Sequence, residues 1–209
     1  MASDQILYFV KYPEPGKVKT RLVRSIGEKE AANVYRECAE KNFQILRSLD
    51  RADTSLTIVF DPPEAEWKIK EWLPGDCSYI PQSEGDLTER LTKAFALAFE
   101  REASRTLAVG SDTLGLPAGF IREAFDALRQ FDVVLGPAKD GGYYLIGLSK
   151  PFPFLFQDIP WSTPAVLETT KARIQEHRLS YDCLPELEDL DEVRNLETYR
   201  LSAKGEWPS

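Results

Sequence analysis

Histidine is almost absent from this chain of 209 residues, in which His177 is the only one. It lies in the stretch ETTKARIQEHR, whose charges are typical of an exposed helix. Catalysis by a Ser-His-Asp or Cys-His group would have to recruit His177, and a zinc site built from several histidines is impossible. We therefore expect the chemistry of this protein to rest on carboxylates, cations and backbone amides.

Cysteine, excess positive charge and long apolar runs are also scarce or missing. Cys38, Cys77 and Cys183 form neither a metal-binding pair nor an evident disulfide framework, and we expect them in the core. The formal net charge of −8 argues against nucleic acid or an anionic membrane as the main partner. No apolar run is long enough to span a bilayer and no signal sequence is recognisable, so the expected location is cytoplasmic.

What the chain does contain is a regular alternation of apolar strands and amphipathic helices. Strands are predicted at residues 6–10, 55–60, 77–80, 106–109, 133–136, 141–148 and 179–183. Helices are predicted at residues 28–49, 86–102, 120–130, 164–178 (with Thr163 as N-cap) and 191–201, and a short one after Pro62 and Pro63. This order indicates an α/β fold whose sheet is mainly parallel, with helices on both faces and late strands running against the sheet.

The densest positive charge on this acidic chain follows the first predicted strand. The first loop, residues 11–24 (KYPEPGKVKTRLVR), sets Lys11, Lys17, Lys19, Arg21 and Arg24 against one acid. Concentrated cations repel one another unless an anion lies among them, and open α/β sheets bind ligands at this carboxyl edge. A glycine-containing turn with such neighbours suits phosphates, although the P-loop spacing is absent. The alternative is a solvated lysine-rich loop.

Two further loops follow predicted strands at the same edge. In the second loop, residues 81–86 (PQSEGD), Gly85 would permit close backbone approach, whereas Asp86 can simply be the N-cap of the helix that carries Arg90. The third loop, residues 110–113 (GSDT), places Asp112 at the carboxyl end of a strand. A carboxylate there suits Mg²⁺ or Mn²⁺, which combine hard oxygen ligands with substrate phosphates; the alternative is a turn cap.

The fourth loop, residues 136–144 (GPAKDGGYY), is a candidate for the acceptor side of a reaction. Paired glycines allow a ligand to lie against the backbone, and Asp-Gly is also a strong hairpin signal, so both interpretations can hold together. With the aromatic Trp161 of the PWST turn, the expected acceptor-binding residues are Asp140, Gly141, Gly142, Tyr143 and Trp161.

An acidic cluster, residues 188–192 (EDLDE), opens the last predicted helix. Acids at a helix N-terminus are favourable for dipole reasons alone. The cluster would bear on a metal site only if the chain folds back towards Asp112 and supplies a second carboxylate.

Six motifs occur in an order that resembles a known superfamily: KYPEPGKVKTRL, QSEGDLTERL, GSDT, GPAKDGGYYLIGL, PWST and DLDEVRNL. Over nearly its whole length the chain is similar to GT-A-like nucleotide-diphospho-sugar transferases. Within that superfamily it most resembles the small bacterial proteins described as rSAM/selenodomain-associated or arsenosugar-biosynthesis glycosyltransferases. The resemblance implies a single GT-A-like domain over residues 1–209.

The resemblance also implies roles for individual residues. Residues expected at the nucleotide are Lys11, Gly16, Lys19, Arg21, Gln82, Gly85, Asp86, Arg90 and Ser111. Catalytic roles are expected for Asp112, Lys19 and Arg21, with Asp112 holding Mg²⁺ or Mn²⁺. The second metal ligand would be Asp191, with Asp189 as the runner-up.

The function implied is metal-dependent transfer from a nucleotide-activated donor, foremost glycosyl transfer from a nucleoside-diphosphate sugar to a small acceptor. One alternative is a nucleotidyltransferase that joins an NTP to a phosphorylated small molecule and releases pyrophosphate; the cation density of the first loop would suit a triphosphate. Another alternative is a non-catalytic nucleotide-binding protein. It is favoured by Leu114, which stands where the branch usually has proline.

Overall fold

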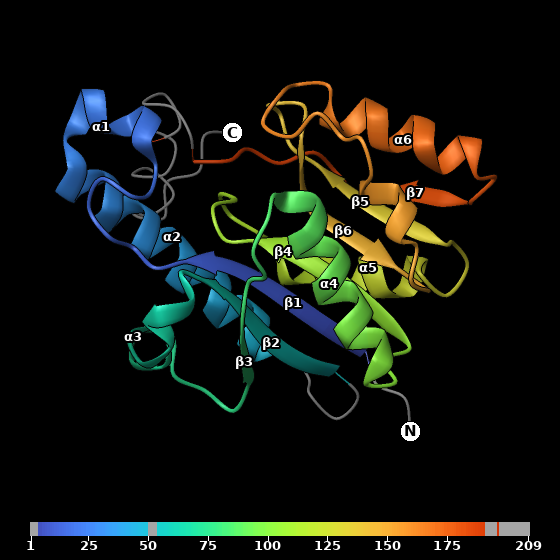
Figure 1. Ribbon diagram of the computed structural model, residues 1–209, viewed down its shortest axis with the longest axis horizontal. Helices are drawn as coiled ribbons and strands as arrows, with labels where there is room; N and C mark the ends of the chain where they lie inside the picture. The colour runs from blue at the N-terminus through green and yellow to red at the C-terminus, as the bar shows by residue number, and fades with distance from the viewer. Residues whose placement is uncertain (1–3, 50–53, 191–195, 197–209) are drawn as a thin grey trace.

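A seven-stranded sheet forms the centre of the molecule in the computed structural model, which describes residues 4–49, 54–190 and 196. The strands lie in the order β3-β2-β1-β4-β6-β5-β7 (Figure 1). Their bounds are β1 Asp4–Lys11, β2 Thr54–Asp61, β3 Ser78–Pro81, β4 Arg105–Gly110, β5 Val133–Pro137, β6 Tyr143–Leu148 and β7 Tyr181–Cys183.

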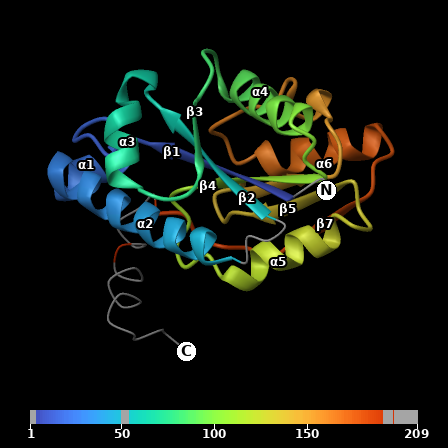
Figure 2. The ribbon, with the colours of Figure 1, turned by 90° about the horizontal axis from the view of Figure 1, so that it is seen from below.

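Helices cover both faces of this sheet (Figure 2). One face carries α2 (Glu28–Ser48), α3 (Glu66–Trp72) and α5 (Ala118–Ala127), and the other carries α4 (Leu87–Glu100) and α6 (Val166–Glu176). The remaining short helices are α1 (Thr20–Ile26), η1 (Pro63–Ala65) and η2 (Pro153–Phe156). The predicted α/β fold, a mainly parallel mixed sheet between helices, is confirmed. Within the described ranges, no helix is long and apolar enough to cross a membrane.

Among the strands that the structure describes, β6 alone runs against its neighbours. It pairs antiparallel with both β4 and β5, whereas β7 pairs parallel with β5. The expectation that the late strands run against the sheet is therefore wrong for β7. A short turn between β5 and β6 reverses the chain, and the longer return through α6 restores the original direction.

The central strand β1 shows how the sheet is held between its two helical layers. Ile6, Tyr8 and Val10 pack in the core cluster on the α2 face, while Leu7 packs in the cluster on the α4 face. This alternation follows from the two-residue period of a strand, and burial on both faces explains the nearly continuous apolar sequence. The half-buried Phe9 also lies on the α4 side, close to the carboxyl end of the strand.

Several local predictions differ from the structure. The helix predicted from residue 164 begins at Val166 with Ala165 as its N-cap residue; Thr163 instead accepts a hydrogen bond from the Ala165 amide at 3.3 Å. The helix α1 was not predicted. Of the helix predicted at residues 191–201, all but residue 196 lies outside the described residues. The core expectation for cysteine is wrong for Cys183, which is exposed in the short edge strand β7.

Candidate functional site

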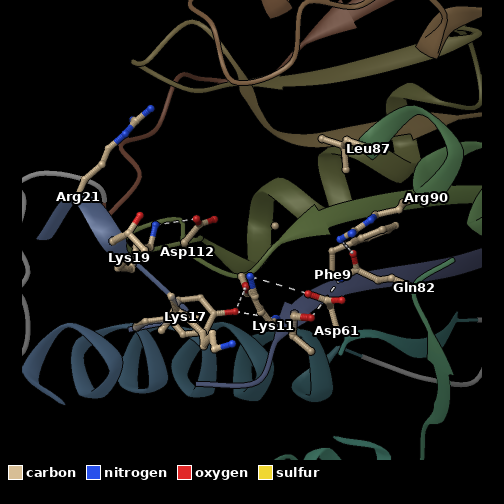
Figure 3. A pocket seen from close by; sticks show the side chains of 16 residues that line it. Phe9, Lys11, Lys17, Lys19, Arg21, Asp61, Gln82, Leu87, Arg90 and Asp112 are labelled. Carbon is tan, nitrogen blue, oxygen red and sulfur yellow. Dashed lines mark hydrogen bonds and ion pairs between the residues drawn. The ribbon is translucent and has the colours of Figure 1, made fainter. Parts of the chain in front are cut away.

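The loops that follow β1, β3 and β4 meet at one edge of the sheet and surround a cleft of about 470 Å³ (Figure 3). They meet because these strands are parallel, so that their carboxyl ends share one edge. The residues lining the cleft are Phe9, Val10, Lys11, Lys17, Val18, Lys19, Thr20, Arg21, Tyr35, Asp61, Gln82, Leu87, Arg90, Gly110, Ser111 and Asp112. Cations of the first loop and Asp112 of the third loop therefore lie in the same cleft, as the sequence predicted.

An ion pair between Lys19 and Asp112 lies at one side of the cleft. Val18 packs against α2 in a small apolar cluster, and Lys19 then takes a left-handed backbone conformation with φ 47° and ψ 46°. That conformation costs a residue with a side chain about 1–2 kcal/mol. In this conformation the Lys19 side chain is only 6% exposed, and its Nζ lies 2.7 Å from Asp112 Oδ2.

The charge state of Asp112 is set by this pair. Burial acts to raise the pKa of Asp112, but the Lys19 charge and hydrogen bond outweigh burial and hold the pKa below its ordinary value. The Asp112 side chain is still 39% exposed. Asp112 is therefore an ionised carboxylate with access to a ligand in the cleft.

Helix α2 holds the third loop from behind. The Tyr35 hydroxyl shares a 2.8 Å hydrogen bond with Ser111 Oγ and accepts one of 2.9 Å from the Lys11 amide. Burial raises the pKa of Tyr35 to about 12, so this hydroxyl stays neutral. Buried Asn42 donates to the Thr113 carbonyl at 2.9 Å. Sequence reasoning missed Tyr35 and Asn42, because on the helix their spacing signals only core packing.

The acidic cluster does fold back towards Asp112. The Leu190 amide donates to the Asp112 carbonyl at 2.9 Å, and Thr113 Oγ1 donates to Asp189 Oδ1 at 3.1 Å. Burial, followed by the nearby Asp112 charge, raises the pKa of Asp189 to about 7. The structure thus brings Asp189 close to Asp112, whereas Asp191 lies outside the described residues.

These two acids are fewer than a protein-only metal site needs. In the part of the chain that the structure describes, no group of three or more His, Cys, Asp or Glu side chains is placed to hold a metal ion. Two neighbouring carboxylates nevertheless match the mode in which Mg²⁺ takes one or two carboxylates and completes its shell with substrate phosphates and water.

The other side of the cleft carries Gln82, Arg90 and Asp61 (Figure 3). Gln82 donates to the Val10 and Val59 carbonyls, both at 3.2 Å, and accepts from Arg90 Nη1 at 3.0 Å. Gln82 therefore bridges two strand ends and orients Arg90. Asp61 was not predicted as a site residue, although its place directly after the apolar run at residues 55–60 is the same signal that singled out Asp112.

Three residues predicted at the nucleotide do not line the cleft. Asp86 is the N-cap of α4 in a full capping box with Glu89, which confirms the alternative interpretation of that residue. Gly85 has φ 104° and contributes its carbonyl to Arg90 Nε at 3.0 Å, and Gly16 has φ 77°. These glycines form the turns that their loops require, while Lys11, Lys19, Arg21 and Ser111 do reach the cleft.

The fourth loop is held together by its own contacts. Asp140 Oδ1 accepts from the Gly142 amide at 2.8 Å, which closes the turn. Gly141 has φ 88°, and a Cβ added there would lie 2.2 Å from the Pro164 carbonyl oxygen. Gly142 has no such constraint, since its nearest neighbour for an added Cβ is the Asp140 carboxylate at 3.1 Å.

A second, mostly apolar cavity of about 110 Å³ adjoins the cleft. It shares Phe9, Leu87 and Gly110 with the cleft, and the Tyr143 ring is one of its walls. Trp161 packs edge-on against Tyr143 with 6.3 Å between ring centroids, and its Nε1 donates to Thr88 Oγ1 at 2.8 Å. Of the residues predicted for an acceptor, Tyr143 alone lines either of these two spaces; the others lie behind it or in its turn.

Comparisons with known proteins agree with this architecture. Residues 45–163 match the family model described as "Uncharacterized protein conserved in bacteria (DUF2064)". A crystal structure from Desulfovibrio desulfuricans G20, of a candidate nucleotide-diphospho-sugar transferase, has 36% sequence identity and a TM-score of 0.85. That alignment covers 96% of this chain and 88% of the other. No curated protein matches the sequence.

More distant solved structures share the fold. One is CMP:2-keto-3-deoxy-manno-octonic acid synthetase in complex with CTP, with 12% identity, a TM-score of 0.60 and coverage of 98% of this chain and 100% of the other. Another is glucosyl-3-phosphoglycerate synthase from Mycobacterium tuberculosis with Mn²⁺, UDP and glucosyl-3-phosphoglycerate. It has 10% identity, a TM-score of 0.56 and coverage of 100% of this chain and 81% of the other.

Proposed function

Because the chain belongs to the DUF2064 family and has the GT-A-like fold of the nucleotide-diphospho-sugar transferases, we propose that it is a transferase that uses a nucleotide-activated donor. The specific reaction proposed is glycosyl transfer from a nucleoside-diphosphate sugar to a small acceptor. The observation that carries this proposal is the Lys19–Asp112 pair, which sets a partly exposed carboxylate beside the cations of the first loop in one cleft.

The cations of the cleft are suited to the diphosphate of such a donor. Lys17, Lys19 and Arg21 all line it, and ionised donors make the stronger hydrogen bonds to phosphate oxygens. Figure 3 shows Lys19 turned to Asp112 and Arg21 extending away from this pair. In the proposed reaction Lys19 and Arg21 stabilise negative charge on the leaving diphosphate, which is electrostatic rather than proton-transfer catalysis.

A divalent cation fits the acidic side of the cleft. Asp112 and Asp189 repel each other, which contributes to the raised pKa of Asp189, and a cation between them would relieve that repulsion. We propose Asp112 as the first ligand, with Asp189 or Asp191 as the second. A bound Mg²⁺ or Mn²⁺ would neutralise charge on the diphosphate leaving group. Support for such an ion comes from the Mn²⁺ in the glucosyl-3-phosphoglycerate synthase complex.

The rest of the cleft is proposed to position the two substrates. Gln82 and Arg90 would contact the nucleoside, and Ser111, fixed by Tyr35, would hold the third loop in place. The acceptor would lie near Tyr143, with the turn at residues 140–142 and Trp161 supporting that ring. We further propose that residues 1–209 form one domain of the rSAM/selenodomain-associated branch, on the strength of the six sequence motifs.

Nucleotidyl transfer is the second candidate. The presence of three cations, Lys17, Lys19 and Arg21, along one cleft wall would suit a triphosphate as well as a diphosphate. The structural similarity to a synthetase solved with CTP also favours it. In that reaction the bond broken is between the α- and β-phosphates of the nucleotide, and pyrophosphate leaves.

A thermal-shift screen of NTPs and nucleotide sugars, with and without Mg²⁺ or Mn²⁺, separates these possibilities, because a ligand of the native state raises the melting temperature. A metal-dependent shift with nucleotide sugars is the result expected for glycosyl transfer. Preference for an NTP, with pyrophosphate released when a phosphorylated acceptor is added, identifies nucleotidyl transfer. Binding that needs no metal and gives no turnover with any acceptor contradicts both and identifies a non-catalytic nucleotide-binding protein.

A further inference from the structure

A second carboxylate, Asp61, faces a cleft that is otherwise rich in cations. It ends β2, lines the cleft with its side chain 21% exposed, and lies on the side of Gln82 and Arg90 rather than of Lys19 and Asp112 (Figure 3). A carboxylate repels phosphate oxygens, so Asp61 is not expected to lie next to the phosphates of a bound nucleotide. In a nucleotide the groups that can satisfy it are N–H and O–H donors of the base or the ribose.

The contacts of Asp61 leave its oxygens accessible to such donors. Within the described residues its carboxylate accepts no hydrogen bond, and its one ion-pair partner, Lys11 Nζ, is 4.0 Å from Oδ2. That distance is too long for a hydrogen bond. Lys11 and Asp61 are register partners on the paired strands β1 and β2, so the sheet itself holds a donor and an acceptor side by side at this end of the cleft.

Nucleobases differ in how well their edges match this pair. Guanine presents one acceptor and two adjacent donors, O6, N1–H and the 2-amino group, so Lys11 can contact O6 while both oxygens of Asp61 accept. Adenine and cytosine offer Asp61 a single amino group beside a ring acceptor. Uracil offers one N–H between two carbonyl oxygens. A carboxylate can therefore make two charge-assisted hydrogen bonds with guanine and one with each of the others.

We propose that the nucleotide bound in this cleft is a guanine nucleotide and that Asp61 is the residue that selects it. This inference rests on the proposed function, because it requires that the cleft binds a nucleotide with its phosphates towards Lys19. The half-buried ring of Phe9 and the guanidinium of Arg90 lie on the same side of the cleft and provide flat surfaces for the base. Asp61 would thus set the specificity of the donor, GDP-sugar or GTP.

The test is calorimetric titration of the full chain with GDP, IDP, XDP, ADP, CDP and UDP in the presence of Mn²⁺. IDP lacks only the 2-amino group, and XDP replaces that group with a carbonyl oxygen. The variant Asp61→Asn keeps one acceptor oxygen for N1–H but turns the second oxygen into a donor, which suits the xanthine carbonyl. Glu84→Gln is the matched control, since it makes the same charge change at an exposed residue of the second loop that does not line the cleft.

The wild type should bind GDP at least about tenfold more tightly than IDP and the other nucleotides. Asp61→Asn should weaken GDP binding by about tenfold to hundredfold and should bind XDP more tightly than GDP, whereas Glu84→Gln should keep the wild-type order. The gain of XDP binding cannot arise from damage to the fold, because a misfolded variant loses every ligand.

Equal affinities for all bases overturn the inference. An Asp61→Asn variant that weakens all of them equally also overturns it and is the result expected if Asp61 binds the ribose hydroxyls. Preference for another base overturns it as well. In each case the proposed function survives if binding still depends on Lys19 and Asp112. If none of the nucleotides binds, the proposed function fails and this inference fails with it.

Discussion

The first and fourth loops leave the same edge of the sheet, and each combines glycine with charged residues, but they use these residues differently. In the first loop the chain is anchored by Val18, and the charge of Lys19 is directed at Asp112 in the cleft. In the fourth loop the charge of Asp140 closes its own turn, and Lys139 pairs with Glu188 at 2.5 Å.

The glycines of the two loops differ in the same way. An added Cβ at Gly141 in the fourth loop meets rigid backbone of Pro164, whereas at Gly16 in the first loop it meets the movable side chain of Glu28 at 3.3 Å. The comparison teaches that a glycine- and charge-rich loop at a sheet edge is not in itself a binding loop. What distinguishes the first loop is that four of its five cations line a space large enough for a ligand.

The largest effect is expected from Asp112→Asn, which removes the carboxylate that Lys19 faces. The amide keeps the size of the side chain but loses the charge that a hard cation needs, so turnover should fall by roughly a thousandfold, or ~4 kcal/mol. The melting temperature should also fall, because the buried Lys19 loses its charge partner, so the variant is assayed well below its melting range. Turnover assays measure this loss, and calorimetry with nucleotide and Mn²⁺ measures the metal-supported affinity. An affinity equal to that of the wild type would make Asp112 structural.

Gly141→Ala tests whether the fourth loop serves the fold. The added methyl would clash with the Pro164 carbonyl, and the backbone at φ 88° is strained for alanine, so we expect a loss of about 2–3 kcal/mol in the free energy of unfolding. Gly142→Ala is the matched control and should cost much less, since only the end of the Asp140 side chain must move. Denaturant titration of both variants measures the difference. Similar losses in the two variants would contradict the packing argument.

Lys19→Ala and Arg21→Ala test whether the first loop binds phosphates. Each should weaken nucleotide binding by about tenfold, or ~1.4 kcal/mol, because each removes a charge-assisted contact. Wild-type affinity should also fall as salt rises, since exposed charges are screened. Titrations at low and high ionic strength provide the check, with Lys139→Ala in the fourth loop as a control that should bind normally. Salt-independent binding would remove the basis of the assignment.

The last prediction is a pH dependence of the free energy of unfolding, caused by Asp189. The charge of Asp189 interacts with Asp112 in the cleft and with Asp140 in the fourth loop. Its pKa is raised from 3.8 to about 7 in the folded state, so the folded chain holds this proton more tightly than the unfolded chain. The contribution to stability is therefore full below about pH 4 and is lost as the pH rises through about 7.

Melting temperatures measured from pH 5 to 8 without metal should show this decline in the wild type and a weaker one in Asp189→Asn. Mn²⁺ should offset the decline in the wild type by neutralising the ionised pair of Asp112 and Asp189. An identical pH profile in the variant would show that another group is responsible.

Much of the fold could be predicted from the sequence because its signals are local. Apolar runs such as residues 55–60 and the helical spacing of residues 28–49 predicted β2 and α2 within a few residues of their observed bounds. Helix α1 was missed because its seven residues follow the loop cations without an apolar period long enough to recognise. The direction of β7 was wrong because strand direction depends on the path through α6, not on the composition of the strand.

Some residues of the candidate site could likewise be recognised from local sequence signals, and others could not. The position of Asp112 at a strand end, and the cations of the first loop, could be recognised from the sequence because a parallel sheet brings such strand ends to one edge. Asp61 has the same position after β2 and was overlooked because no neighbouring motif drew attention to it. The sequence could not decide whether Asp86 is an N-cap or a ligand, because an acid directly before a helix is compatible with both roles. The structure shows the N-cap.

By itself, then, the sequence determined the alternation of strands and helices, the net negative charge with one basic loop, and the presence of a single histidine. These properties depend on residue type and on spacing along the chain. Only the tertiary structure decided that Lys19 pairs with Asp112 over 93 positions, that residues 188–190 return to the third loop, and that Gly141 is packed against Pro164. Such contacts join residues far apart in the chain, and their partners are chosen by packing, which no local pattern records.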